Sequence, residues 1–170
     1  TSAGSDVPLT EPMRTEITAS AARMAAMGYR ILALADRAGS VAGGARAEDE
    51  TDMRFVGLVG LIDPPRPDAA EAVRRCHQAG IRVHMITGDA ALTASAVAEE
   101  VGIDVSVVVD DQELAAMTDA QLSTLVGHGE VVFARASPQD KLRIAHAVRS
   151  VGEVFAMTGD GVNDAPALRY

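Results

Sequence analysis

The chain has 170 residues, of which 15 are basic and 24 are acidic, so its net charge is -9. Phosphate backbones are bound through a surplus of Lys and Arg, and this balance therefore argues against nucleic acid as a main partner. A single cysteine, Cys76, excludes an internal disulfide framework and fits a reducing compartment. No apolar stretch reaches the roughly 18 residues of a membrane-spanning helix, and no basic-then-apolar leader is present. We therefore expect a soluble segment.

The N-terminal 62 residues are predicted to combine one helix with two strands. The predicted helix and strands span 15–30, 30–35 and 54–62, and Gly28 closes the helix. Between the strands, residues 37–52 are rich in Gly and Ala and then acidic, which is typical of a solvated surface loop. The segment DPPRP, 63–67, follows with three prolines that favour a stiff, extended connection. We place a domain boundary there.

From Asp68 onward, predicted helices and strands alternate, as in the βαβ units of a parallel sheet. The predicted helices span about 68–79, 91–101 and 138–150, with shorter helical turns at 110–117 and 118–126. The predicted strands span 81–86, 105–109, 130–135 and 153–158. The start of the third helix is marked by Ser137 as N-cap and Pro138 at the first helical position. The predicted fold class is α/β with a doubly wound parallel sheet, whose ligands lie beyond the carboxyl ends of the strands.

Two of the predicted strands end in the same tripeptide, Thr-Gly-Asp. The segments are MITGD, 85–89, and AMTGDGVNDAP, 156–166. After a buried parallel strand, Gly permits backbone conformations that bring N–H groups close to an anion, and a following helix start adds partial positive charge. Thr87 and Gly88 could therefore contact a phosphate through a hydroxyl group and the main chain.

Charged residues in the second of these loops and in the third helix extend the pattern. Asp160 and Asp164 offer the hard oxygen ligands that Mg²⁺ takes beside phosphate, and Asp160 is the better ligand candidate. Asn163 can orient a phosphoryl oxygen without adding repulsion. Lys141, in the first helical turn, could neutralise a phosphate at the helix N-terminus. Alone, a Thr-Gly-Asp segment favours an ordinary turn and Lys141 a solvated side chain, while the Asp-Gly-Val-Asn-Asp loop fits calcium binding and a tight turn equally well. Their ordered co-occurrence predicts phosphoryl-transfer chemistry.

Four segments resemble the cytoplasmic signature segments of P-type cation-transporting ATPases, in the same order along the chain. They are DPPRP, MITGDAALTA, FARASPQDK and AMTGDGVNDAPAL. The likeness runs from about Tyr29 to the end and is closer to the calcium and sodium/potassium pump branch than to the heavy-metal branch. It implies three parts: 1–62, the C-terminal part of a nucleotide-binding domain; 63–67, a hinge; and 68–170, a haloacid-dehalogenase-like phosphorylation domain without its nucleophile segment and C-terminal end.

The resemblance also implies a role for each matching residue and for the partners of the chain. The implied site comprises Arg30 on the nucleotide phosphate, Thr87, Gly88 and Asp89 on the nucleotide, the basic pair Arg135 and Lys141, Asn163 on nucleotide or phosphate, Asp160 on Mg²⁺, and Asp164 as a supporting acid. Of these, Lys141, Asp160 and Asp164 are the expected catalytic residues. ATP and Mg²⁺ are the expected cofactors. The expected location is the cytoplasmic face of a membrane protein, with the rest of a pump as partner and the transported cation bound elsewhere.

The family nucleophile, an aspartate in an Asp-Lys-Thr-Gly-Thr segment, has no counterpart in this sequence. Asp63 follows an apolar strand, but Pro64 and Pro65 occupy places where backbone N–H donors would be required, so we expect a hinge there. The parent is expected to be an ATP-driven cation transporter, and this chain alone to form no phosphoenzyme. Two alternatives remain open: a soluble haloacid-dehalogenase-like phosphohydrolase, which needs its own nucleophilic aspartate, and a non-catalytic nucleotide-binding fragment.

Overall fold

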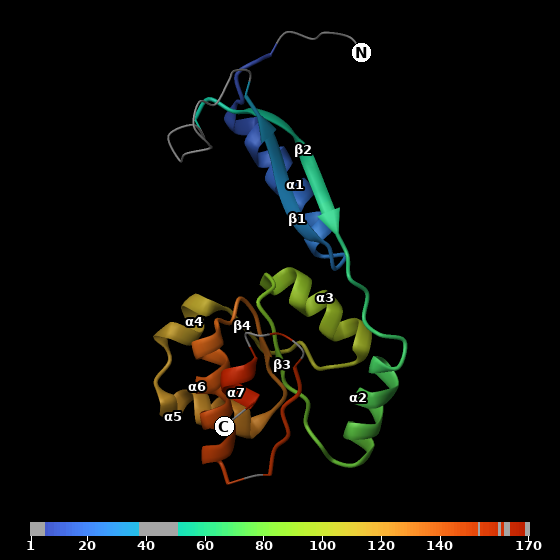
Figure 1. The fold of residues 1–170 in the computed structure, drawn as a ribbon, viewed down its shortest axis with the longest axis vertical. Helices are drawn as coiled ribbons and strands as arrows, with labels where there is room; N and C mark the ends of the chain where they lie inside the picture. The colour runs from blue at the N-terminus through green and yellow to red at the C-terminus, as the bar shows by residue number, and fades with distance from the viewer. Residues whose placement is uncertain (1–5, 38–50, 153, 160, 162–163, 169–170) are drawn as a thin grey trace.

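The computed structural model describes residues 6–37, 51–152, 154–159, 161 and 164–168. Within them the chain forms two parts, one above the other in Figure 1 and joined by the segment after the second strand. Most of the predicted loop at 37–52 lies outside the described residues, as do Asp160 and Asn163.

The first part, which we call the N-terminal unit (residues 6–62), is a helix against a two-stranded antiparallel sheet. Its elements are α1 (Glu11–Ala25), β1 (Arg30–Asp36) and β2 (Arg54–Leu61). The helix begins four residues before the predicted start at Thr15, because Pro12 in its first turn suits a helix N-terminus. Gly28, with φ +83°, then turns the chain into β1.

The N-terminal unit packs closely at one point but buries little. A Cβ atom on Gly60 of β2 would lie 2.8 Å from the Met24 side chain and 3.0 Å from that of Tyr29, so glycine lets α1 approach the sheet. None of the residues described in this unit is fully buried. Large apolar side chains, including Leu32 and Val56, remain 47% and 60% exposed. This part therefore has no closed core among its described residues.

The second part, which we call the sheet unit (residues 68–168), has helices on both faces of a small parallel sheet. Its elements are α2 (Ala69–Gln78), β3 (Met85–Ile86), α3 (Ala91–Val101), β4 (Val108–Val109), α4 (Asp111–Ala116), α5 (Asp119–His128), β5 (Val132–Phe133), α6 (Pro138–Ser150) and α7 (Ala165–Leu168). The sheet order is β3-β5-β4, and both pairings are parallel. Figure 1 shows α2 and α3 on one side of the sheet and α4, α5 and α6 on the other.

The central strand β5 sends alternate side chains into two separate cores. Val131 and Phe133, both fully buried, pack with Leu114, Leu122 and residues of α6. Val132 and Ala134 pack on the other face against the buried alanines of α3. This period of two is what a strand covered on both faces requires. The predicted doubly wound α/β class is therefore confirmed in an incomplete form.

Strand lengths are where the predictions from sequence were wrong. Only Met85 and Ile86 of the predicted strand 81–86 pair, and residues 154–158 form no strand although 153–158 was predicted as one. A strand exists only where a neighbour completes its ladder, and β3 is an edge of the three-stranded sheet. Val154 is fully exposed and has no ladder partner among the described residues.

Helix starts, by contrast, follow local side-chain chemistry. Asp110, Thr118 and Ser137 each form a capping box with the residue three positions later, at the starts of α4, α5 and α6. The helical turns predicted at 110–117 and 118–126 are thus distinct helices. No helix in the described part of the chain has the length and apolar character that a membrane crossing requires.

Candidate active site

The first Thr-Gly-Asp loop continues the sheet for one more residue before it turns. The Thr87 N–H donates to the Phe133 carbonyl at 2.9 Å, beyond the last paired residue of β3. The Thr87 hydroxyl then donates to Asp89 Oδ2 at 3.1 Å and accepts from the Asp89 N–H at 3.1 Å. The side chains of Thr87 and Asp89 therefore support one another, and the exposed Gly88 forms the tip of the loop.

The loop after β5 is hydrogen-bonded directly to this first loop. The Arg135 N–H donates to the Asp89 carbonyl at 2.8 Å, and the Ala136 N–H donates to the Thr87 carbonyl at 2.9 Å. Arg135 has φ +52°, a left-handed conformation that costs a residue other than glycine about 1 kcal/mol. The two strand-end loops thus form one surface, as their positions in a parallel sheet predict.

The N-terminus of α6 comes next in the chain and is firmly capped. Ser137 Oγ accepts from the Asp140 N–H at 3.2 Å, and Asp140 Oδ2 accepts from the Ser137 N–H at 2.9 Å. The Lys141 N–H donates to the Ser137 carbonyl at 3.0 Å, which places Lys141 in the first turn. Asp140 is therefore occupied in the cap, and the side chain of Lys141 extends from this turn toward another partner.

Lys141 forms an ion pair with Asp164, which lies just before α7. The two side chains are 13% and 12% exposed, and the Gly161 N–H adds a 3.0 Å hydrogen bond to Asp164 Oδ2. The hydrogen bond from Lys141, supported by Gly161, lowers the pKa of Asp164 below its ordinary value despite the opposing effect of burial. Asp164 is therefore ionised at neutral pH, and the pair carries no net charge.

Glycine is required beside this ion pair. A Cβ atom on Gly159 would lie 2.6 Å from Asp164 Oδ2, closer than any such contact allows. The loop can therefore pass against the carboxylate only because Gly159 has no side chain.

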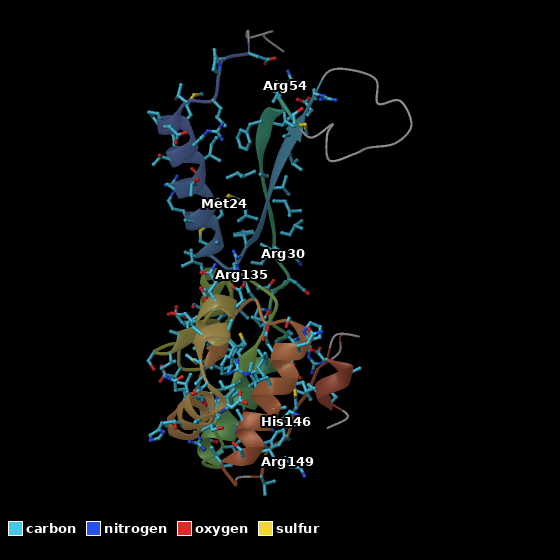
Figure 2. The ribbon with its side chains drawn as sticks, turned by 90° about the vertical axis from the view of Figure 1, so that its left-hand side faces the viewer. Met24, Arg30, Arg54, Arg135, His146 and Arg149 are labelled. Carbon is cyan, nitrogen blue, oxygen red and sulfur yellow. The ribbon has the colours of Figure 1, made fainter. Side chains whose placement is uncertain are left out.

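Arg30 lies at the edge of the N-terminal unit that faces the sheet unit. It opens β1, its side chain is exposed, and Figure 2 shows Arg30 and Arg135 on either side of the junction between the two units.

Because Asp160 and Asn163 lie outside the described residues, their predicted roles stay predictions. The structure thus brings together the two loops, the α6 N-terminus and the Lys141–Asp164 pair.

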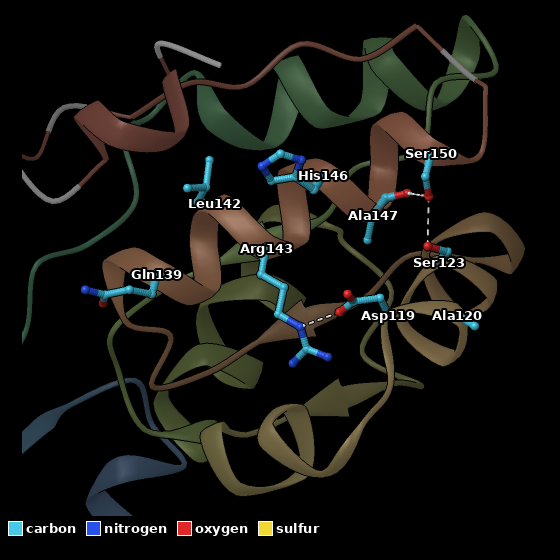
Figure 3. Close-up of a pocket in the computed structure, with 9 residues that line it drawn as sticks. All are labelled: Asp119, Ala120, Ser123, Gln139, Leu142, Arg143, His146, Ala147 and Ser150. Atoms are coloured by element: carbon cyan, nitrogen blue, oxygen red, sulfur yellow. Dashed lines mark hydrogen bonds and ion pairs between the residues drawn. The ribbon is translucent and has the colours of Figure 1, made fainter.

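Arg143 helps to hold α6 in place and was not predicted from the sequence. Its guanidinium donates to the Leu114 and Met117 carbonyls at 2.8 and 2.5 Å and to Asp119 at 2.9 Å. It thereby ties α6 to the end of α4 and the start of α5; Figure 3 shows its pair with Asp119. No signal in a single sequence separates this arginine from a solvated one, since two of these partners are backbone carbonyls and the third, Asp119, lies 24 residues away.

Glu130 is a second supporting residue that was not predicted from the sequence. It lies at the opposite end of the sheet. Its carboxylate, 10% exposed, accepts from the Val83 N–H at 2.5 Å, the Asp104 N–H at 3.0 Å and His77 Nε2 at 2.8 Å. Burial raises the pKa of Glu130, but these hydrogen bonds outweigh it and hold the pKa below its ordinary value. One ionised carboxylate therefore fixes three chain segments.

A groove in the sheet unit lies away from the candidate site. It has a volume of about 590 Å³ and runs between α5 and α6, where its lining includes Leu142, His146 and Ala147. Figure 3 shows these side chains along the length of α6. None of the predicted site residues that the structure describes lines it.

With this geometry in view, comparison with known proteins gives the family. Residues 5–170 match the family described as haloacid dehalogenase-like hydrolase. The chain belongs to this family of hydrolases.

Its relatives narrow the class further. The chain is 42% identical over 98% of its length to calcium-transporting ATPase 1 of Yarrowia lipolytica, and 44% identical over 92% to cation-transporting ATPase pma1 of Synechocystis. It is also 42% identical over 95% to the sodium/potassium exporting P-type ATPase cta3 of Schizosaccharomyces pombe. The resemblance to P-type cation-transporting ATPases is confirmed. The chain spans only 17–18% of the length of these relatives.

Proposed function

We propose that this chain is the cytoplasmic catalytic segment of an ATP-driven cation transporter, binding ATP and Mg²⁺ for phosphorylation of an aspartate. The observation that carries the proposal is the Lys141–Asp164 ion pair at the start of α6, beside two hydrogen-bonded strand-end loops. Phosphoryl transfer depends mainly on positioned charge, and this is where the sheet gathers it. The names of the relatives agree with this activity.

The proposed division of labour follows the chain. Residues 1–62 belong to the nucleotide-binding domain, 63–67 to the hinge, and 68–170 to the phosphorylation domain. Arg30 contacts the nucleotide phosphate from the first of these, while the loop of Thr87, Gly88 and Asp89, together with Arg135 and Asn163, holds the nucleotide from the other. Arg30 and Arg135 already flank the junction between the units, where one ligand would meet both, and the hinge would let the units move apart after phosphate transfer, a domain motion of the usual kind.

Lys141 is proposed to neutralise the transferred phosphate. In the structure its charge is already balanced by Asp164, so an incoming phosphate must draw the ammonium from the carboxylate or share it. Asp164 would then be left with the Gly161 N–H and an unpaired charge. A cation beside it would remove that penalty.

The donor chemistry fits Mg²⁺ as that cation. Asp164 is an ionised carboxylate in a short loop, and Mg²⁺ takes one or two carboxylates and leaves its other positions to water and phosphate. Asp160 is the proposed ligand and Asp164 the supporting acid. No cluster of three or more carboxylate, histidine or cysteine side chains occurs among the described residues, so a fully protein-built metal cage is not part of the proposal. Bound Mg²⁺ would supply neutralisation of phosphate charge.

Titration calorimetry of the 170-residue chain with ATP, with and without Mg²⁺, tests the proposal. We expect Mg²⁺-dependent binding that Lys141→Met weakens at least tenfold, the size of a lost charge-assisted contact. Arg14→Met, which removes an exposed cation of α1 that pairs with Glu11, should bind like the parent chain. Absence of binding to the parent chain would contradict the proposal.

Labelling with γ-phosphate-labelled ATP separates the alternatives. We expect no acid-stable phosphoenzyme, because the sequence lacks the Asp-Lys-Thr-Gly-Thr nucleophile. Turnover of a phosphate monoester would favour the soluble phosphohydrolase. Binding without turnover agrees with the proposal and with a non-catalytic fragment, and restoration of phosphoenzyme on adding a polypeptide that carries the nucleophile segment would separate those two.

A further inference from the structure

Thr93 joins the two units through a side chain that the sequence did not single out. It lies in the first turn of α3, the helix that follows the Thr-Gly-Asp loop, and is only 6% exposed. Its hydroxyl donates to the Tyr29 carbonyl at 3.1 Å, across 64 residues of sequence. The acceptor belongs to the residue immediately before Arg30.

This bond is not the one a helical threonine ordinarily makes. A threonine in a helix tends to donate to the carbonyl four residues earlier, as Thr15 and Thr124 do here at 3.0 and 2.9 Å. For Thr93, which comes three residues after the N-cap Ala90, that carbonyl belongs to Asp89, which lies before the helix and accepts the Arg135 N–H at 2.8 Å. The Thr93 hydroxyl is thus directed out of its own helix and into the N-terminal unit.

The acceptor end of the bond is itself held firmly. Tyr29 follows the left-handed Gly28, donates its N–H to the Met24 carbonyl at 3.3 Å, and packs against Gly60 of β2. Arg30 then begins the pairing of β1 with β2, opposite Leu61. A hydrogen bond to Tyr29 therefore fixes the start of β1, and with it the Arg30 backbone, against α3.

We propose that Thr93 is a positioning residue that sets the spacing between Arg30 and the Thr-Gly-Asp loop, so that both reach one nucleotide. Three observations support it: the burial of Thr93, the hydrogen bond of its hydroxyl outside the helix, and its acceptor next to Arg30. That the ligand is a nucleotide rests on the proposed function. That Thr93 sets the spacing of the two units does not.

The test measures geometry and binding separately, in the 170-residue chain. Thr93→Val removes the hydroxyl at nearly constant shape, and Thr93→Ser keeps it as the matched control. Nitroxide labels on cysteines introduced at the exposed positions Ala22 and Gln112, with Cys76→Ser, report the distance between the units by pulsed electron resonance. Titration calorimetry with Mg²⁺ and ATP reports affinity.

We expect one narrow distance distribution for the parent chain and for Thr93→Ser, and a broader one for Thr93→Val. The valine variant should also bind ATP about fivefold more weakly, the size of one buried hydrogen bond, with the serine variant unchanged. A valine variant with the parent distribution would overturn the proposal. If the parent chain binds no ATP, the proposed function fails, but the label distances still decide the role of Thr93.

Thr93→Ala is the second variant if valine prevents folding, because alanine favours the helix. If valine and alanine both unfold the chain while serine does not, the hydroxyl is needed for the fold itself, and the positioning role is wrong.

Discussion

Replacing Lys141 by methionine should destabilise the chain by about 2 kcal/mol at neutral pH. Removing one partner of a fully buried ion pair costs about 3–5 kcal/mol, whereas an exposed pair contributes less than about 1 kcal/mol. The Lys141–Asp164 pair lies between these limits, because its side chains are 13% and 12% exposed and Asp164 keeps the Gly161 hydrogen bond. Methionine keeps the unbranched shape of the lysine side chain and is one atom shorter, so packing changes little.

The loss should depend on pH in a direction fixed by Asp164. Its pKa in the folded chain lies below the ordinary 3.8, mainly because of the Lys141 hydrogen bond. A lowered carboxyl pKa contributes stability that is complete above the unfolded pKa and is lost as pH falls through the folded pKa. The difference between Lys141→Met and the parent chain should therefore be full at pH 7 and shrink below pH 3.8.

Urea unfolding followed by far-ultraviolet circular dichroism measures both effects. Arg14→Met is the control, since its pair with Glu11 is 58% and 88% exposed at 3.6 Å and should change the free energy of unfolding by less than about 0.5 kcal/mol. Two results would refute the reasoning. One is a Lys141→Met effect no larger than that of the control, and the other is a difference that does not shrink in acid.

Three further substitutions test other parts of the sheet unit by the same urea assay. Ser137→Ala should cost about 1 kcal/mol, because it removes the capping box of α6, and an unchanged midpoint would show that the cap contributes nothing. Gly159→Ala should cost about 1–3 kcal/mol by forcing a methyl group into Asp164, whereas Gly57→Ala, with nothing within 4 Å, should be nearly neutral; equal effects of the two would contradict the contact. Glu130→Gln should cost about 1–3 kcal/mol at pH 7 by turning an acceptor into a donor. Because the pKa of Glu130 lies below 4.5, the parent chain should lose this advantage as pH falls below that value, and parallel pH profiles would count against it.

Features of the fold that depend on neighbours in sequence could be predicted closely. The start of α6 was predicted to the residue, because Ser137 and Pro138 carry the capping chemistry themselves. The end of α3 was also predicted, since Gly102 adopts the left-handed conformation with φ +83°. In both cases the residues at the helix end are enough to predict its position.

Strand extents could not be predicted, because they depend on partners far away in sequence. The apolar run at 81–86 is long enough for a strand, yet only its last two residues lie opposite β5. The run at 154–158 has similar composition and pairs with nothing described. Hydrophobicity indicates where a strand can form, and the available edges decide where it does.

The candidate site likewise has features that could be predicted from sequence and features that could not. The adjacency of the two loops followed from the rule that parallel strands end at one edge, and the structure joins them through Arg135 and Asp89. The left-handed conformation of Arg135 did not follow, because nothing in its sequence neighbourhood requires it. Arg143, Glu130 and Thr93 were missed for a common reason: each acts on a backbone group remote in sequence.

The charges around the site bear on why a divalent cation belongs in the proposal. The whole chain carries a net charge of -9, so at a distance it repels a nucleotide, and only groups within about 10 Å act against that field. Lys141 is the one lysine in the sequence, and Asp164 already balances it. A bound triphosphate would therefore meet the arginines at the junction and an ion pair without net charge. Their positive charge is too small to balance the negative charge of the triphosphate. Mg²⁺ beside Asp164 would compensate the carboxylate and release the Lys141 ammonium for phosphate, and this would make the proposed ATP binding dependent on the metal.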